Sequence, residues 1–154
     1  MLRKLFQRFF SLVLLGLLLI STGVGASNLT NNTKSDPTQF SKQVVDALYN
    51  YNYQNYQKKL NEASDYFTNL GWRKYKKGLD ASNNVQAVKK MKMTVTEKIV
   101  GPIKIIPAKD TLTSIVPVEI TYHTTRTVNK KLFKINIKMI RELGSLKITD
   151  IKFQ

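Results

Sequence analysis

Residues able to carry catalytic or metal chemistry are few in this chain. Its 154 residues include one histidine, His123, and no cysteine. Zinc and copper sites need several imidazole or thiolate ligands, and a disulfide or a thiol nucleophile needs cysteine, so these sites are excluded. Glu62, Asp65 and Asp80 form no recognisable acid–base pair, and no serine has the partners of a triad. We therefore assign no catalytic, cofactor-binding or metal-binding residue and expect no cofactor.

Positive charge is the second chemical feature of the chain. It has 25 Lys and Arg residues against 10 Asp and Glu, a formal net charge of +15. The charge could bind nucleic acid, or it could be a solvated surface that faces anionic lipid headgroups. We favour the second interpretation and expect no nucleic-acid partner, because no DNA-binding motif accompanies the charge. The basic patch consists of Arg73, Lys74, Lys76, Lys77, Lys89, Lys90 and Lys92.

Closely spaced tyrosines form a third candidate group. Tyr49, Tyr51, Tyr53 and Tyr56 could stack on bases or line a ligand groove. On a helix they would fall on both sides, so we expect them to serve mainly in the core or at an interface.

The N-terminal segment has the order of a secretory signal. Arg3, Lys4 and Arg8 precede an apolar run over residues 9–20, which is short for a membrane span. Small residues at Val24 and Ala26 predict cleavage between Ala26 and Ser27. A retained anchor over residues 9–26 is the alternative. In both cases the remainder of the chain is exported across the inner membrane.

Helical spacing occupies the middle of the chain. Residues 27–39 are polar and read as a flexible linker. From Phe40 onward, apolar residues recur with helical period and predict a first helix of about five turns. Gly71 and Gly78 are expected at turn or cap positions. Further helical segments are predicted over residues 64–67, 69–79 and 83–90.

After Met91 the hydrophobic period changes to two, which is typical of strands. Pro117 predicts an edge position or a bulge, and a change of apolar phase predicts a bulge near Thr149. Helices followed by antiparallel strands indicate an α+β fold, with three or four helices packed on a curved antiparallel sheet of about four strands. The predicted strands span residues 93–99, 112–122, 133–139 and 146–153.

A series of short motifs runs through residues 47–72. An Asn-Tyr pair ends an aromatic-rich stretch, and a Leu-x-x-Ala-Ser segment, a Tyr-Phe-Thr and a Gly-Trp follow. In order and spacing this stretch resembles the signature region of the DotI/IcmL family of type IVB (Dot/Icm) secretion systems, which is related to the conjugation protein TraM. The resemblance extends over residues 40–154. The signature residues are Tyr51, Tyr53, Asn55, Tyr56, Leu60, Ala63, Ser64, Tyr66, Phe67, Gly71 and Trp72.

The resemblance implies a periplasmic domain of the nuclear-transport-factor-2-like kind. Its implied work is oligomeric assembly and contact with other apparatus subunits, not catalysis, and the signature residues would serve packing or an interface. The implied division is a signal peptide or anchor over residues 1–26, a linker over 27–39 and the domain over 40–154. Family members of the inner-membrane complex have a longer cytoplasmic segment and a full transmembrane helix. We therefore expect an IcmL-like paralogue or accessory protein, in the periplasm or anchored at the inner membrane.

Two other functions stay open at this point. The chain could be an exported protein that binds a small ligand in the space between helices and sheet, or nucleic acid on its basic surface. It could also be an effector that acts outside the cell.

Overall fold

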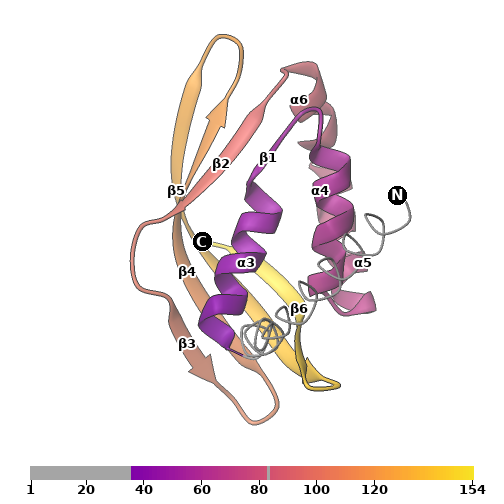
Figure 1. The fold of residues 1–154 in the computed structure, drawn as a ribbon, viewed down its shortest axis with the longest axis vertical. Coiled ribbons are helices and arrows are strands. Elements are labelled where there is room, and N and C mark those ends of the chain that lie inside the picture. The colour runs from indigo at the N-terminus through magenta and orange to yellow at the C-terminus, as the bar shows by residue number, and fades with distance from the viewer. Residues whose placement is uncertain (1–35, 83) are drawn as a thin grey trace, which may run out of the picture. The chain divides into compact units, whose positions relative to one another are not determined.

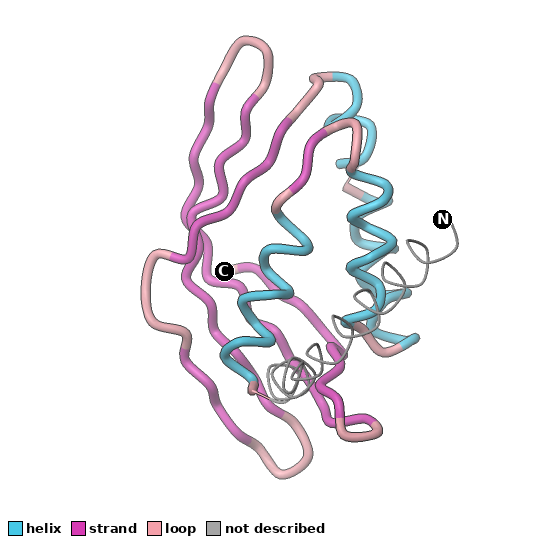
Figure 2. Tube along the Cα trace, in the orientation of Figure 1, coloured by secondary structure: helices cyan, strands magenta, loops and turns pink. Residues whose placement is uncertain are grey.

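The computed structural model describes residues 36–82 and 84–154, and within them a helical layer covers one face of an antiparallel sheet (Figures 1 and 2). The helices are α3 (Pro37–Tyr49), α4 (Tyr56–Ala63), α5 (Asn69–Ala81) and α6 (Asn84–Lys90), with a 3-10 turn, η1 (Ser64–Tyr66). The strands are β1 (Tyr51–Asn52), β2 (Thr94–Ile99), β3 (Lys104–Pro107), β4 (Leu112–His123), β5 (Val128–Glu142) and β6 (Ser145–Phe153). The predicted α+β architecture is confirmed.

The sheet has the order β1-β2-β4-β5-β6, and β3 pairs with β4 beside β2. All strand pairs are antiparallel. This makes six strands where the sequence predicts about four. The two additional strands, β1 and β3, are two and four residues long, which is too short for an alternating pattern to stand out.

Helix α3 begins at Pro37, three residues before the predicted start at Phe40. The Asp36 carboxylate accepts hydrogen bonds from the backbone N–H groups of Thr38 (3.0 Å) and Gln39 (3.3 Å). An acidic N-cap followed by proline at the first helical position is a strong start signal, because it satisfies free N–H groups and presets the first backbone angle.

The predicted five-turn first helix is wrong, because the chain leaves the helix after Tyr49. The Asn52 side chain accepts from the backbone N–H groups of Gln54 and Asn55, and the Asn55 side chain accepts from that of Asn52. Asparagine side chains that satisfy local backbone groups in this way compete with the helix. Tyr51 and Asn52 then pair with β2, and the helical layer resumes in α4.

The core lies between the helices and the inner face of the sheet. On β4 and β5 the inner residues alternate with outer ones, and pairs such as Val118 and Phe133 face the helices. The residues that are less than 2% exposed include Val44 and Val45 on α3 and Ile120, Ile135 and Ile137 on the sheet. Burial of these side chains holds the two layers together.

Two irregularities that the sequence predicts lie inside the sheet. The pairing of β5 with β6 shifts register between Lys138 and Met139, so that Thr149 has no partner, which confirms the bulge there. Pro117 is not at a sheet edge, because β4 pairs with strands on both sides. On one side of β4 the neighbouring chain is interrupted between β2 and β3, and Pro117 lies opposite this gap. There the Pro117 carbonyl accepts a hydrogen bond from Val100 N–H, and no N–H is needed from the proline.

Helix α5 is seated directly on β6. The backbone N–H of Thr68 donates to the carbonyl of Ile148 at 2.9 Å, and the Thr68 hydroxyl caps the helix by accepting from Gly71 N–H. A Cβ added at Gly71 would collide with that same Ile148 carbonyl. Gly71 and Gly78 both lie inside α5 and not at turns, unlike the prediction. The missing side chain at Gly71 allows the helix to approach the strand closely.

Across residues 36–82 and 84–154, no helix combines the length and the apolar character that a membrane span requires.

Candidate functional site

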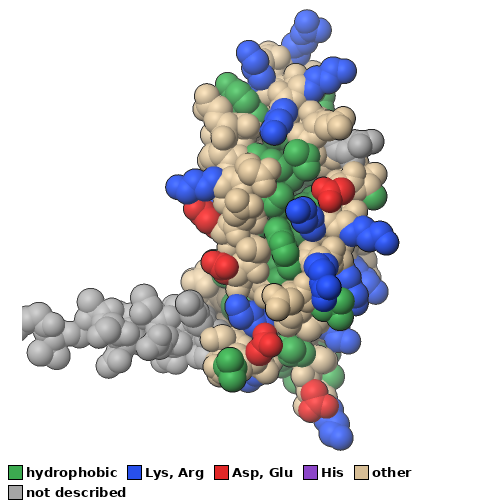
Figure 3. All heavy atoms as spheres, turned by 90° about the vertical axis from the view of Figure 1, so that its right-hand side faces the viewer, with side chains coloured by type: hydrophobic (Ala, Val, Ile, Leu, Met, Phe, Trp, Pro, Cys, Tyr) green, Lys and Arg blue, Asp and Glu red, His purple; other side chains and the backbone are tan. Residues whose placement is uncertain are grey.

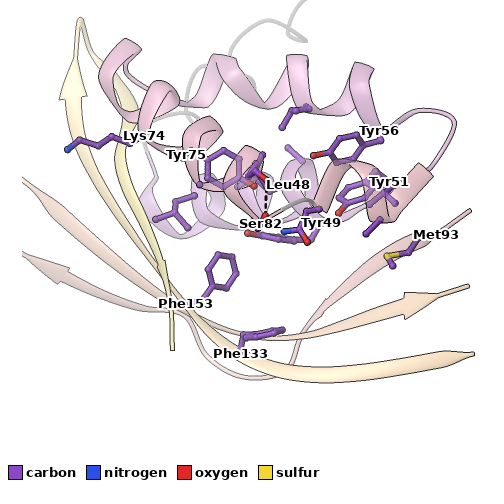
Figure 4. A pocket seen from close by; sticks show the side chains of 18 of the residues that line it. Leu48, Tyr49, Tyr51, Tyr56, Lys74, Tyr75, Ser82, Met93, Phe133 and Phe153 are labelled. Atoms are coloured by element: carbon purple, nitrogen blue, oxygen red, sulfur yellow. Dashed lines mark hydrogen bonds between the residues drawn. The ribbon is translucent and has the colours of Figure 1, made fainter. Parts of the chain in front are cut away.

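A cavity of about 530 Å³ lies between the helical layer and the sheet. Its helical side comes from α3, α4, α5 and α6 and includes Leu48, Leu60 and Val88. Its other side comes from the inner face of the sheet and includes Phe133, Ile151 and Phe153. Figure 4 shows Phe133 and Phe153 on this side. Elements separated by most of the chain thus meet around one space.

Aromatic rings in mutual contact dominate the lining. Tyr51 and Tyr56 meet edge to face with ring centroids 4.9 Å apart. Phe153 makes edge contacts with Tyr49 and with Phe133, each at 5.8 Å. These contacts fix the rings, because edge-to-face pairs are favoured over a free arrangement.

The tyrosine hydroxyls in this space are held in the neutral form. Burial raises the pKa of Tyr49, Tyr51 and Tyr75, and burial together with the Asp80 carboxylate raises the pKa of Tyr56. Neutral phenols can donate a hydrogen bond as well as accept one. The Tyr56 hydroxyl is buried and finds no hydrogen-bond partner among the described residues, whereas the Tyr49 hydroxyl lies beside that of Tyr75.

Four of the signature residues line this cavity, and they are Tyr51, Tyr56, Leu60 and Gly71. The others lie in the packing around it. Ala63 and Phe67 are buried in the core, and Tyr66 packs edge to face on Phe40 at 5.8 Å. Trp72 is half-buried and contacts the rings of Phe67 (5.4 Å) and Tyr75 (5.8 Å). Asn55 and Ser64 hydrogen-bond to nearby backbone groups, and Tyr53 is half-buried outside the cavity.

The basic patch is fully displayed on the helical side and at its junction with β2. Arg73, Lys74, Lys76 and Lys77 are exposed along α5, and Lys89, Lys90 and Lys92 are exposed at the end of α6 and just beyond it. Within the described ranges none of the seven makes an ion pair. Figure 3 shows Lys and Arg side chains gathered around a strip of apolar groups on this face.

Several cavity residues are not among the sequence-predicted site residues. Tyr122, Phe133 and Phe153 come from strands that lie far from the helices in the sequence, and Met93 lies between α6 and β2. All four residues lie on the apolar side of the period-two pattern, and this pattern is the sequence signal that could have identified them. The alternation alone does not tell which inner residues the helices cover and which they leave open.

One acidic group points toward the helices from the sheet. Glu97 lies on the inner phase of β2, between the core residues Val95 and Ile99, and its Oε2 atom is buried without a described partner. Burial and the nearby Asp46 carboxylate raise the pKa of Glu97. It faces no nucleophile, and we assign it no chemical role.

The other candidate residues do not form a site. His123 is exposed at the end of β4. Among residues 36–82 and 84–154 no three His, Cys, Asp or Glu side chains are grouped to hold a metal ion. The predicted cleavage point at Ala26 and Ser27 lies outside the described residues.

Comparison with known proteins supports the predicted resemblance. The DotI/IcmL family model, for a type IVb secretion system inner-membrane complex component, matches residues 26–146. No curated protein matches the chain by sequence.

Three solved structures share the fold. An IcmL-like type IV secretion system protein from Legionella pneumophila is 22% identical, with a TM-score of 0.71, over 76% of this chain and 88% of that one. The periplasmic domain of DotI is 24% identical, with a TM-score of 0.70, over 76% and 91%. A periplasmic fragment of TraM is 21% identical, with a TM-score of 0.62, over 75% and 92%.

Proposed function

Because this chain belongs to the DotI/IcmL family of type IVb secretion components, we propose that it is a non-catalytic IcmL-like protein of the Dot/Icm apparatus. It acts in the periplasm or at the inner membrane, where it assembles with itself or with other subunits. The observation that carries the proposal is the family match, which spans almost all of the described domain.

Exposed apolar side chains offer two surfaces for such assembly. On the outer face of β5, Val128 is 63% exposed and Leu132 is 72% exposed, and on α5, Leu70 is 56% exposed. Apolar groups displayed on an otherwise polar surface gain most from a partner that covers them. We propose that the sheet face or the helical face carries the subunit contact.

Assembly can be tested with the purified chain by sedimentation velocity and by capture of apparatus subunits from cells. We expect self-association or specific capture, weakened in Leu132→Asp or in Leu70→Asp. Ala108→Asp, in the exposed turn between β3 and β4, adds the same charge at the other end of β4 from Val128 and Leu132 and should change nothing. A strict monomer that captures no apparatus subunit would contradict the proposal.

Membrane proximity is the part of the proposal that the basic patch supports. Each Lys or Arg near an anionic surface contributes roughly 1 kcal/mol of attraction, which salt screens. We expect binding to vesicles that contain anionic lipid and none to neutral vesicles. Salt-sensitive binding to DNA with no vesicle binding would favour a nucleic-acid role instead.

The location can be decided by N-terminal sequencing and cell fractionation. A mature chain that begins at Ser27 is a periplasmic protein, and an intact Met1 in the membrane fraction is an anchored one. Recovery from the medium alone would point to an exported effector and would contradict the apparatus role.

A further inference from the structure

The cavity between the helices and the sheet opens to solvent as a groove between α5 and β6. On the helical side the exposed residues Lys74, Gly78 and Ser82 recur every four positions and line this groove, and on the β6 side Ile151 and Phe153 line it. A Cβ added at Gly78 would meet no atom within 4 Å, so the space beside the helix is open there. We call this opening the α5–β6 groove.

Strand β6 is at the edge of the sheet, and its last residues have no strand on their free side. Lys134 and Gln154 exchange two backbone hydrogen bonds, of 2.9 and 3.0 Å. Hydrogen-bonded and non-hydrogen-bonded pairs alternate along an antiparallel ladder, so Ile151 and Phe153 turn their N–H and C=O groups away from β5. Within residues 36–82 and 84–154 these groups meet no partner. Unpaired backbone groups along a strand edge form a template for a further strand.

The earlier part of the same edge already holds a chain segment. Phe67 lies beside Ile148 in a parallel bridge, and Thr68 N–H donates to the Ile148 carbonyl at 2.9 Å. After this point the chain turns into α5, and the described residues provide no further backbone pairing along the edge. The edge therefore accepts a strand as far as Ile148 and stays open beyond it.

The inner face of this edge is apolar. The side chains of Ile151 and Phe153 point inward, and Phe153 is 46% exposed. Figure 4 shows Phe153 on the sheet side of the space and Tyr75 on its helical side. Side chains alternate along a strand, so a strand added beside β6 would place every second side chain against these apolar groups.

The rims of the groove are basic. Lys74 and Lys77 are exposed on α5, and Lys152 is exposed on β6. The Asp150 carboxylate also lines the groove, but it lies 3.7 Å from the Lys152 ammonium, which offsets its charge. A second copy of this chain would bring a further net charge of +15, whereas an acidic partner would be attracted.

We propose that the α5–β6 groove binds an extended acidic peptide segment of another protein, which pairs with the free edge of β6 as an added strand. The backbone groups of Ile151 and Phe153 align the peptide, and its apolar side chains at alternate positions enter the cavity. The acidic side chains between them lie near the lysines of the rims. This inference does not rest on the apparatus role, because the groove and its edge would accept such a peptide from any source.

The test uses a capped seven-residue peptide that alternates glutamate and valine, titrated into the full chain by calorimetry. It should bind saturably with one peptide per chain. Gly78→Leu fills the groove and should weaken binding by about tenfold or more, while thermal unfolding should show no loss of stability, because leucine favours a helix over glycine. Gln86→Leu adds the same side chain at an exposed position of α6 outside the groove and should bind like the unaltered chain.

A matched pair of charge variants tests the rim. Lys74→Glu should weaken binding by about 3–10-fold, because it replaces attraction with repulsion at the groove. Lys76 is exposed on the opposite side of α5 and does not line the groove. Lys76→Glu makes the same change in net charge and should have little effect. Equal losses in the two variants would mean that the peptide responds only to the overall charge, and would overturn the proposal.

Two methylated peptides test the strand pairing itself. One has N-methyl groups on the valines and the other has them on the glutamates, and both keep the charge and the side chains. In an added strand only one of these two sets of N–H groups faces β6, so only one methylated peptide should lose binding. Loss with the valine set indicates an antiparallel strand, and loss with the glutamate set a parallel one.

Three other outcomes would overturn the proposal. They are no saturable binding of the unmethylated peptide, equal affinity of the two methylated peptides, and unchanged binding in Gly78→Leu. Self-association that Gly78→Leu abolishes, without any peptide binding, would assign the groove to a second copy of the chain instead.

Discussion

At the scale of single residues, Glu97 is the clearest case of a side chain whose environment opposes its charge. It lies on the inner face of the sheet, and burial and Asp46 raise its pKa. The folded state therefore holds the Glu97 proton more tightly than the unfolded chain does. Its ionisation costs stability at neutral pH, and this cost disappears as the pH falls below the raised pKa.

We accordingly expect Glu97→Gln to raise the free energy of unfolding at pH 7, with a gain that shrinks as the pH is lowered into the range where a glutamate in solution is protonated. Urea unfolding at several pH values measures this. Glu119→Gln is the control, because Glu119 is on the outer face with its carboxylate 2.9 Å from the Lys130 ammonium. A gain that stays constant down to low pH would contradict the explanation.

Trp72 tests the packing of the helical layer. The ring contacts Phe67 and Tyr75 but is only half-buried. Trp72→Ala should therefore cost about 1.5–3 kcal/mol, less than the ~3–5 kcal/mol of a fully buried tryptophan. Trp72→Phe should cost less, as it keeps a ring. An unchanged urea midpoint in Trp72→Ala would mean that the ring contributes nothing to the layer.

At the scale of elements, the two glycines of α5 should respond in opposite ways to the same substitution. Gly71→Ala places a Cβ against the Ile148 carbonyl, and overpacking of this kind costs about 1–3 kcal/mol. Around Gly78 there is open space, so Gly78→Ala should stabilise the helix by about 0.5–1 kcal/mol. Thermal unfolding of the pair measures both, and equal shifts would show that α5 is not seated on β6 as described.

The bulge in β6 holds one extra residue without changing which residues face the core. Ile148 pairs with Met139 and Asp150 pairs with Lys138, so a strand without Thr149 keeps Ile151 and Phe153 inward. We therefore expect deletion of Thr149 to cost only about 0.5–1.5 kcal/mol, for the lost hydroxyl bond to the Lys138 carbonyl. Deletion of Ile151, in the regularly paired part of the strand, places Lys152 opposite Ile137 and should cost more than about 3 kcal/mol. Equal losses of unfolding free energy in the two deletions would contradict the assigned register.

These elements also show what the sequence can and cannot predict. The strand periods and the bulge at Thr149 were predictable, because each leaves a mark in the local alternation of apolar residues. The break at residues 50–55 was not, since tyrosines with helical spacing mask the asparagine turns that stop the helix. Tyr56 and Phe153 line the same cavity although they are far apart in the chain. The space between them depends on the curvature of the sheet and on the packing of α5 against β6, and local sequence patterns contain neither.

At the scale of the whole molecule, the net charge of +15 should act against the folded state. Like charges repel more strongly in the compact form, and ion pairs such as those of Lys58 and Lys130 lie at the surface, where they contribute little. Raising NaCl from about 0.02 to about 0.5 M should increase the melting temperature by about 2–4 °C. Sucrose at matched osmolality serves as the control. A melting temperature that falls with salt would mean that surface ion pairs outweigh the repulsion.

The contact between α5 and β6 also determines when the domain can close. The two are joined through Thr68 and Ile148, 80 residues apart, and β6 leaves the ribosome after every other described element. Until β6 has been synthesised, α5 has no strand to pack against, and β5, with its inner residues Ile137 and Met139, lacks its neighbouring strand. A nascent chain that ends before residue 145 should thus remain open and sensitive to proteases, since pairing across such a separation is slow and comes late. If the chain is exported as proposed, late closure would keep the polypeptide extended, and so able to cross the membrane, until β6 has been made.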